Sequence, residues 1–138
     1  MRVYVDSSAL VKRALREPES EFITAELERL AIAGTPIFSS TIAWVESSRA
    51  IRKRRDGVAP GAIADLVEVA LSGVSEFTVS ETVVSLARRI GPLTLRSLDA
   101  IHLATATLID ADLVIAYDER LLLAAEELGF ATASPGGS

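Results

Sequence analysis

The stretch Leu113-Val114-Ile115-Ala116-Tyr117-Asp118 contains the clearest buried strand of the chain, because its apolar residues run without interruption up to an aspartate. A helix is predicted directly after it, over residues 119–128. The N-terminal end has the same order: Arg2-Val3-Tyr4-Val5 leads to Asp6 and then to apolar residues at helical spacing. Strands that alternate with helices indicate parallel pairing, since parallel neighbours need a long crossover connection. The sequence therefore predicts an α/β domain with three layers, α/β/α, around a mainly parallel sheet.

Periodicity and helix-stop signals place the remaining elements. Short strands are expected at residues 36–39 and 76–79, and helices at 9–15, 19–33, 41–55, 60–71, 81–90 and 97–108. Ser39 or Ser40 is expected to cap the 41–55 helix, and Ser97 the 97–108 helix. Residues 1–133 are expected to form one domain, and residues 134–138 a loose tail.

Composition excludes several classes of protein. Hydrophobic residues make up 49% and charged residues 24% of the 138 residues, which is ordinary for one packed globular domain. The chain has no cysteine, so it has no disulfides, thiol nucleophiles or cysteine-based zinc sites. His102 is the one histidine, and no Gly-x-Ser-x-Gly turn is present to give it a serine partner for a hydrolase triad.

The net charge and the hydropathy of the chain limit how it can bind nucleic acids and membranes. Lys and Arg number 14 against 19 Asp and Glu, a net charge of −5, which argues against a general nucleic-acid coat. A polyanion would have to bind local basic patches. Neither a signal peptide nor an apolar run of about 20 residues is present, so we expect a cytoplasmic protein that does not bind membranes.

Asp6 and Asp118 are the first candidate functional residues, because ligands of open α/β sheets bind beyond the carboxyl ends of the strands. If both strands are central, the two carboxylates share one edge of the sheet. Each aspartate also precedes a helix, so an N-cap is the alternative interpretation of each.

Glu46 and Asp99 lie on helices whose neighbouring positions are apolar. Glu46 falls within the apolar arc of its helix and needs a partner or a metal there; the alternative is a weak ion pair with Arg49. Asp99 lies in the first turn of its helix, where the alternative is a favourable interaction with the helix N-terminus. His102 can point the same way as Asp99, although a histidine satisfied within the core is the more common arrangement.

Together the four acids predict a metal site. Two carboxylates about 4 Å apart repel by about 4 kcal/mol at an effective dielectric constant of about 20, so a convergent set needs divalent cations. Oxygen ligands favour Mg²⁺ or Mn²⁺. Such a site suits phosphodiester hydrolysis, because a metal lowers the pKa of bound water and stabilises the charge of the transition state.

Four segments of the chain match a known family in order and spacing. They are Val3-Tyr4-Val5-Asp6-Ser7-Ser8-Ala9-Leu10; Glu46; Leu98-Asp99-Ala100-Ile101-His102-Leu103-Ala104; and Tyr117-Asp118-Glu119-Arg120-Leu121 with Ala124-Ala125-Glu126-Glu127-Leu128-Gly129. In these segments, over nearly the whole chain, it resembles the PIN-domain nucleases, and most closely the VapC-type toxin ribonucleases of bacterial toxin–antitoxin pairs.

The resemblance implies an Mg²⁺-dependent endoribonuclease, with Mn²⁺ as a possible substitute, that cuts structured RNA such as transfer or ribosomal RNA and so inhibits translation. The implied metal ligands are Asp6, Glu46, Asp99 and Asp118, and the family's small hydroxyl near the first acid falls on Ser8. Many relatives have Thr or Ser where Ala116 stands, which puts one supporting hydrogen bond in doubt.

The resemblance also implies two protein partners, a cognate VapB-like antitoxin and a second copy of the chain in a homodimer. In such toxins the early helices form a groove for the antitoxin. The apolar face of the 19–33 helix, with Phe22, Ile23, Leu27 and Leu30, is either part of that groove or part of the core.

A run of basic residues ends the helix that carries Glu46. It consists of Arg49, Arg52, Lys53, Arg54 and Arg55. We expect a track for RNA phosphates that leads toward Glu46, with Lys12, Arg13 and Arg16 adding to it. The alternative is a solvated helix end favoured by the helix dipole. Aromatic residues make up only 5% of the chain, so RNA would be recognised by shape and backbone.

Other classes with strand-end aspartates fit less well. A phosphoacceptor receiver domain needs a lysine late in the chain, whereas the last lysine is Lys53. A haloacid-dehalogenase-like phosphatase needs an aspartate where Ser8 stands. Two alternatives stay open: a catalytically inactive PIN-like binding module, and a PIN nuclease that processes RNA without an antitoxin.

Overall fold

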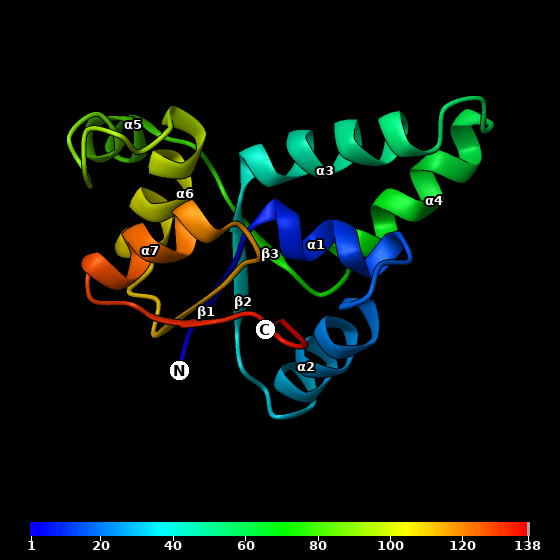
Figure 1. Cartoon of the computed structure of the whole chain (residues 1–138), viewed down its shortest axis with the longest axis horizontal. Coiled ribbons are helices and arrows are strands. Elements are labelled where there is room, and N and C mark those ends of the chain that lie inside the picture. Colours follow the sequence, from blue (N-terminus) through cyan, green and yellow to red (C-terminus); the bar gives the residue numbers. More distant parts are fainter. Residues whose placement is uncertain (138) are drawn as a thin grey trace.

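Five short parallel strands form the central sheet of the computed structural model, in the order β3-β2-β1-β4-β5. The structure describes residues 1–137. In chain order the elements are β1 (Val3–Val5), α1 (Ser7–Ala14), α2 (Ser20–Ile32), β2 (Ile37–Ser40), α3 (Thr41–Arg54), α4 (Pro60–Leu71), β3 (Ser75–Phe77), α5 (Glu81–Ala87), α6 (Ser97–Leu108), β4 (Leu113–Ile115), α7 (Glu119–Glu127) and β5 (Ala131–Ala133). Helices lie on both sides of the sheet (Figure 1). The predicted three-layer α/β/α architecture is confirmed.

Alternation along the strands builds a core on each face of the sheet. Val3 and Val5 of β1 pack with α1 and α2, whereas Tyr4 between them packs with α6 and α7. All three side chains are fully buried. Because strand side chains alternate between faces, a single short central strand anchors both helical layers.

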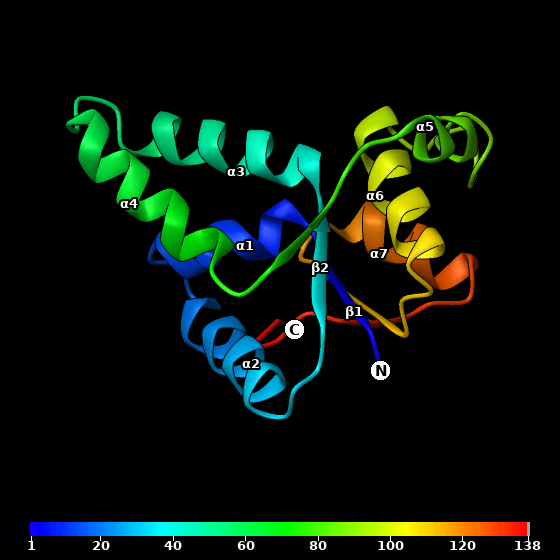
Figure 2. The same ribbon diagram turned by 180° about the vertical axis from the view of Figure 1, so that it is seen from behind.

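Helices α3 and α4 form an arm that extends from the α1 side of the sheet (Figure 2). Its own small core joins Ile51 of α3 and Ala70 of α4 to Leu15 after α1. Gly57, in the turn between α3 and α4, has a φ of +86°, a backbone conformation that glycine adopts without strain. The arm therefore holds the basic end of α3 away from the sheet.

Most predicted elements are confirmed, and the differences are at element ends. β4 ends at Ile115 and not at Tyr117, because its partner β1 ends opposite Ile115, at Val5. Helix α5 ends at Ala87, shorter than predicted; Ile90 beyond it leaves the helix and packs on the α6 side of the core. Strand β3, at Ser75–Phe77, begins one residue earlier and ends two residues earlier than predicted.

Of the helix caps predicted for α3 and α6, the first is confirmed and the second is wrong. Ser40 caps α3 by accepting a hydrogen bond from the Ile42 amide at 3.3 Å, as predicted. Ser97 does not cap α6: it is the first helical residue, and the cap position belongs to Arg96, whose side chain makes no capping hydrogen bond. The first turn of α6 therefore has no side-chain cap.

Helix α2 and the C-terminal segment pack against the sheet. Ile23, Leu27 and Leu30 are buried in the core, whereas Phe22 is 56% exposed. The predicted tail begins with two half-buried residues: Ser134 donates to the Ala116 carbonyl at 2.7 Å, and the Pro135 carbonyl accepts from the Tyr117 hydroxyl at 2.6 Å. Residue 138 of that tail lies outside the described residues. Within residues 1–137, no helix has the length and apolarity needed to cross a membrane.

Candidate active site

All four acids predicted from the sequence line one cavity of about 580 Å³. Asp6 follows β1, Asp118 follows β4, Glu46 lies in the second turn of α3 and Asp99 in the first turn of α6. The cavity lies where the parallel strands end, as is general for ligand sites of open α/β sheets. The fold thus brings together carboxylates that are far apart in the chain.

The two strand-end aspartates are N-caps and cavity residues at the same time. Asp6 Oδ1 accepts from the Ala9 amide at 3.2 Å, and Asp118 Oδ1 accepts from the amides of Arg120 and Leu121 at 2.9 and 3.2 Å. No hydrogen bond to Oδ2 of either aspartate is found within residues 1–137. The capping interpretation is therefore correct, and it leaves one oxygen of each carboxylate free.

Ser8 connects the two strand ends. Its hydroxyl donates to Asp6 Oδ1 at 2.6 Å and accepts from the Tyr117 amide at 3.0 Å. The small hydroxyl that the sequence singled out thus contacts the first acid and also holds the backbone that leads to Asp118.

Glu46 is held by Ser7 and His102, and not by Arg49, its alternative partner. Its Oε1 accepts from the Ser7 hydroxyl at 3.1 Å and lies 2.7 Å from His102 Nε2. An ion pair with Arg49 is not found in the described part of the chain. His102 itself is satisfied in the core, 2% exposed, with its other nitrogen on the Tyr4 hydroxyl. The expectation of a core histidine is confirmed, and this core histidine also reaches an acid of the cavity.

Asp99 is the acid with the least support from the protein. Its Oδ2 is buried without a hydrogen-bond partner within residues 1–137. Burial and the nearby charge of Asp118 raise the pKa of Asp99, against the opposing effects of His102 and Arg96. A buried carboxylate oxygen without a partner is costly, so this position favours a bound cation.

The buried position of Asp6 is unfavourable for its charged carboxylate. Burial raises the pKa of Asp6 to about 6, although nearby His102 and the hydrogen bonds from Ser8 and Ala9 act in the opposite direction. The carboxylate of Glu46 adds to the increase. The charged form of Asp6 is therefore destabilised in the protein without metal.

The acids suit a hard divalent cation by their chemistry. Three of them use one oxygen within the protein and keep the other, and Asp99 has an orphaned buried oxygen. As the side chains stand, no three acidic or histidine side chains of residues 1–137 lie close enough together to hold a metal. The residues present fit the predicted metal by their chemistry.

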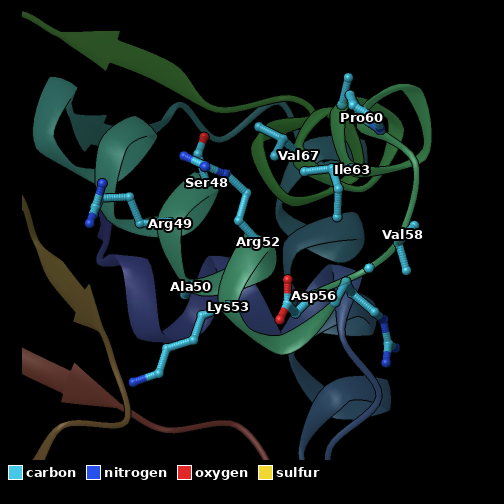
Figure 3. Close-up of a pocket in the computed structure, with 13 residues that line it drawn as sticks. Ser48, Arg49, Ala50, Arg52, Lys53, Asp56, Val58, Pro60, Ile63 and Val67 are labelled. Atoms are coloured by element: carbon cyan, nitrogen blue, oxygen red, sulfur yellow. The ribbon is translucent and has the colours of Figure 1, made fainter.

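The basic residues predicted from the sequence fall into two groups. Arg49, Arg52 and Lys53 are exposed and line a groove of about 1150 Å³ between α3 and α4, together with Arg55. Figure 3 shows Arg49 and Lys53 extending from the side of α3 opposite to Ile63 and Val67 of α4. Ala50 lines both this groove and the acidic cavity, so the two are adjacent.

Lys12 and Arg13 are held by the protein itself. Lys12 lines the acidic cavity, but its ammonium pairs with Glu17 at 2.6 Å and Glu19 at 3.0 Å. Burial opposes the charge, and these hydrogen bonds outweigh it and raise the pKa of Lys12. Arg13 is half-buried and donates to the carbonyls of Ala70 and Ser72 at the end of α4. Arg13 does not line the acidic cavity.

Sequence reasoning missed several residues of the site. Ser7, Arg96 and Tyr117 line the cavity, and Arg96 forms no ion pair in the part of the chain that the structure describes. The only available signal for Arg96 was its place before the helix of Asp99. Ala116, where the family resemblance implies Thr or Ser, is fully buried against α6 and α7 and is not a lining residue. Its missing hydroxyl therefore removes no group from the cavity wall.

The fold and the acids can now be compared with known proteins. The family model of the PIN domain matches residues 3–127. The chain belongs to the PIN-domain family. Ribonuclease VapC47 and ribonuclease VapC46 of Mycobacterium tuberculosis are 40% and 38% identical to this PIN domain, over 136 and 135 residues. These alignments cover 97% and 96% of this chain and 97% of each relative. The domain is therefore of the VapC type.

Solved structures share the fold of this PIN domain. VapC20 of Mycobacterium tuberculosis, described as a sarcin-ricin loop cleaving toxin, matches with a TM-score of 0.70 at 16% identity, over 96% of this chain and 99% of its own. VapBC2 of Rickettsia felis, bound to a DNA fragment from its promoter, matches with a TM-score of 0.73 at 14% identity, over 96% and 98%. At such low identity the likeness extends to the fold alone.

Proposed function

We propose that this PIN domain is a divalent metal-dependent endoribonuclease that hydrolyses phosphodiester bonds in structured RNA and acts as the toxin of a toxin–antitoxin pair. One observation carries the proposal: four carboxylates converge on one cavity, and at least one oxygen of each has no partner within the described residues. The similarity to two ribonucleases named VapC supports RNA as the substrate.

Asp6, Glu46, Asp99 and Asp118 would hold the metal, for which we propose Mg²⁺, with Mn²⁺ as a substitute. When bound, a divalent cation supplies charge that stabilises the transition state and makes a water molecule more acidic. The protein positions the ligands: Ser8 and the first amides of α1 hold Asp6, and the first amides of α7 hold Asp118. Arg96 at the cavity wall would contact a phosphate of the RNA.

We propose that the RNA backbone approaches along α3. Arg49, Arg52 and Lys53 are exposed cations next to the acidic cavity, and they offset the net charge of −5 locally. Contacts of this kind neutralise phosphates without reading bases. Transfer or ribosomal RNA, rather than unstructured RNA, fits a protein that recognises shape and has few aromatic residues for base stacking.

The proposal includes the protein's partners and location. A cognate VapB-like antitoxin would neutralise the toxin, the chain would form a homodimer, and both would be in the cytoplasm, where translation is inhibited. The similarity to ribonucleases named VapC and to the VapBC2 structure supports the antitoxin. The exposed Phe22 and Ile32 of α2 provide apolar surface for a protein contact.

Purified chain incubated with total cellular RNA tests the function. We expect discrete fragments with Mg²⁺ or Mn²⁺, none with EDTA, and none with the Asp99→Asn variant, which controls for contaminating nuclease. Folded wild-type protein, free of antitoxin, that cuts no RNA would contradict the proposal and favour an inactive binding module. Cleavage by a chain that has no antitoxin partner would instead indicate an RNA-processing nuclease.

A further inference from the structure

A chain of hydrogen bonds runs from the core of the sheet to the acidic cavity. The Tyr4 hydroxyl lies 2.5 Å from His102 Nδ1, and His102 Nε2 lies 2.7 Å from Glu46 Oε1. Tyr4 is fully buried and His102 is 2% exposed. The three residues belong to β1, α6 and α3, so the bonds link three elements at the cavity.

The direction of these hydrogen bonds follows from Glu46. A carboxylate oxygen only accepts, so His102 carries a hydrogen on Nε2 and donates it to Glu46 Oε1, which also accepts from the Ser7 hydroxyl at 3.1 Å. A neutral imidazole with its hydrogen on Nε2 accepts at Nδ1, here from the Tyr4 hydroxyl.

Two hydrogen-bond donors on one oxygen of Glu46 determine which of its oxygens can bind a cation. Because Oε1 is occupied by His102 and Ser7, Oε2 is the oxygen left for a cation. Arg49 lies one turn further along α3 and is exposed, so it is the competing partner of Glu46 on the same helix. The bond to His102 holds Glu46 away from that ion pair.

We propose that Tyr4 and His102 are positioning residues that hold Glu46 in the orientation needed to bind the metal. This inference rests on the proposed function, because it acts through the metal site. Partners of metal ligands fix their orientation, and their loss generally lowers metal affinity by about 10- to 100-fold. A histidine that served only to fill the core would not need its second nitrogen on a cavity carboxylate.

Matched substitutions of His102 separate positioning from packing. His102→Gln places an amide donor near the position of Nε2 and preserves the bond to Glu46, whereas His102→Asn places its amide near Nδ1 and does not reach Glu46. Mn²⁺ binding to RNA-free protein, measured by calorimetry, should therefore weaken roughly 10-fold or more in His102→Asn and stay near wild type in His102→Gln. Tyr4→Phe, which frees the histidine to carry its hydrogen on Nδ1, should weaken Mn²⁺ binding as well.

Ile109→Val controls for general destabilisation, because Ile109 is buried at the end of α6 and does not line the cavity. It should lower the melting temperature and leave Mn²⁺ affinity unchanged. Equal Mn²⁺ affinity in His102→Asn and wild type, or equal weakening in His102→Gln and His102→Asn, would overturn the positioning role.

The same experiment distinguishes this role from the proposed function. Wild-type protein that binds Mn²⁺ with the expected ranking of variants but cuts no RNA would support the positioning role and overturn the ribonuclease. RNA cleavage by wild-type protein, together with equal Mn²⁺ affinities in all variants, would support the ribonuclease and overturn the positioning role. Wild-type protein that binds no Mn²⁺ would overturn both.

Discussion

The Ser8 hydroxyl donates a hydrogen bond of 2.6 Å to Asp6 Oδ1, across the turn that joins β1 to α1. The same hydroxyl accepts from the Tyr117 amide at 3.0 Å. One small side chain thus ties the end of β1 to the segment that leads from β4 to Asp118.

Ser8→Ala should lower RNA cleavage by about 10-fold, because a ligand loses the partner that orients it. Loss of the two hydrogen bonds should also lower the free energy of unfolding by about 1 to 3 kcal/mol. Ser8→Thr keeps the hydroxyl and is the matched control. Single-turnover cleavage rates and urea unfolding measure the two effects, and equal rates in Ser8→Ala and wild type would contradict the assigned role.

Asp6→Asn should stabilise the metal-free protein at neutral pH while abolishing cleavage. The pKa of Asp6 is about 6 in the folded protein, above its ordinary value of 3.8. Between these values the folded state binds more protons than the unfolded state, so stability falls as the pH rises from about 4 to about 6 and stays lower above that. Removing the charge should therefore raise the free energy of unfolding at pH 7.5, by up to about 3 kcal/mol.

Calorimetry in EDTA at several pH values tests this expectation. The advantage of Asp6→Asn should be nearly absent at about pH 3, where wild-type Asp6 is mostly protonated in both states, and full at pH 7.5. Asn also caps helices well, so Asp6→Ala, which loses the cap as well, should be less stable than Asp6→Asn by about 1 kcal/mol. A lower melting temperature for Asp6→Asn than for wild type at pH 7.5 would refute the destabilising charge.

Divalent cations should stabilise the wild-type protein more than Asp99→Asn. Asp99 Oδ2 is buried without a partner within residues 1–137, and its pKa is raised by burial and by Asp118. A cation at 100 times its Kd adds about 2.7 kcal/mol to the stability of a protein that it binds only when folded. Melting curves with Mg²⁺ or Mn²⁺, against NaCl of equal ionic strength, measure the gain; the same gain in Asp99→Asn would show that Asp99 does not bind the metal.

Removing the cations of α3 should weaken RNA binding in a salt-dependent way. Arg49 and Lys53 are exposed and lie beside the acidic cavity. In an Asp99→Asn background that cannot cut, Arg49→Ala with Lys53→Ala should reduce the salt slope of log K for a structured RNA by roughly 0.7 to 0.9 for each lost phosphate contact. Fluorescence anisotropy at several salt concentrations measures the slope.

Arg13→Ala is the matched control for the RNA-binding variants. Its guanidinium donates to two backbone carbonyls at the end of α4, so its loss should lower stability by about 1 to 3 kcal/mol and leave the salt slope unchanged. A changed slope in Arg13→Ala with an unchanged slope in the α3 variant would reverse the assignment of the two groups.

Truncation after Ala133 tests the proposed domain boundary. We propose that residues 1–133 fold and act alone. Because Ser134 and Pro135 are hydrogen-bonded to Ala116 and Tyr117, truncation should lower the melting temperature by a few degrees without loss of cleavage. Tyr117→Phe, which removes one of these bonds, should reproduce part of the decrease. An unfolded or inactive truncated chain would place the boundary beyond residue 133.

The alternation of strands and helices, the three-layer architecture and the four acids of the cavity are predictable from the amino-acid sequence alone. These are local signals: an apolar run marks a strand wherever it lies, and an aspartate just beyond a strand stays at that end of the sheet. Ser40 was predictable as a cap for the same reason, since its partner is two residues away. Ser8 was implied by the family resemblance, and its partner Asp6 is also two residues away.

The tertiary structure alone decided which partners the functional side chains have. Glu46 pairs with His102 rather than with Arg49, and Lys12 pairs with Glu17 and Glu19 rather than facing solvent. Spacing along a helix predicts which residues share a face, but it does not predict what another element places opposite that face. In this chain the crossover connections bring β1, α3 and α6 together, and that long-range packing makes the Tyr4–His102–Glu46 chain of hydrogen bonds.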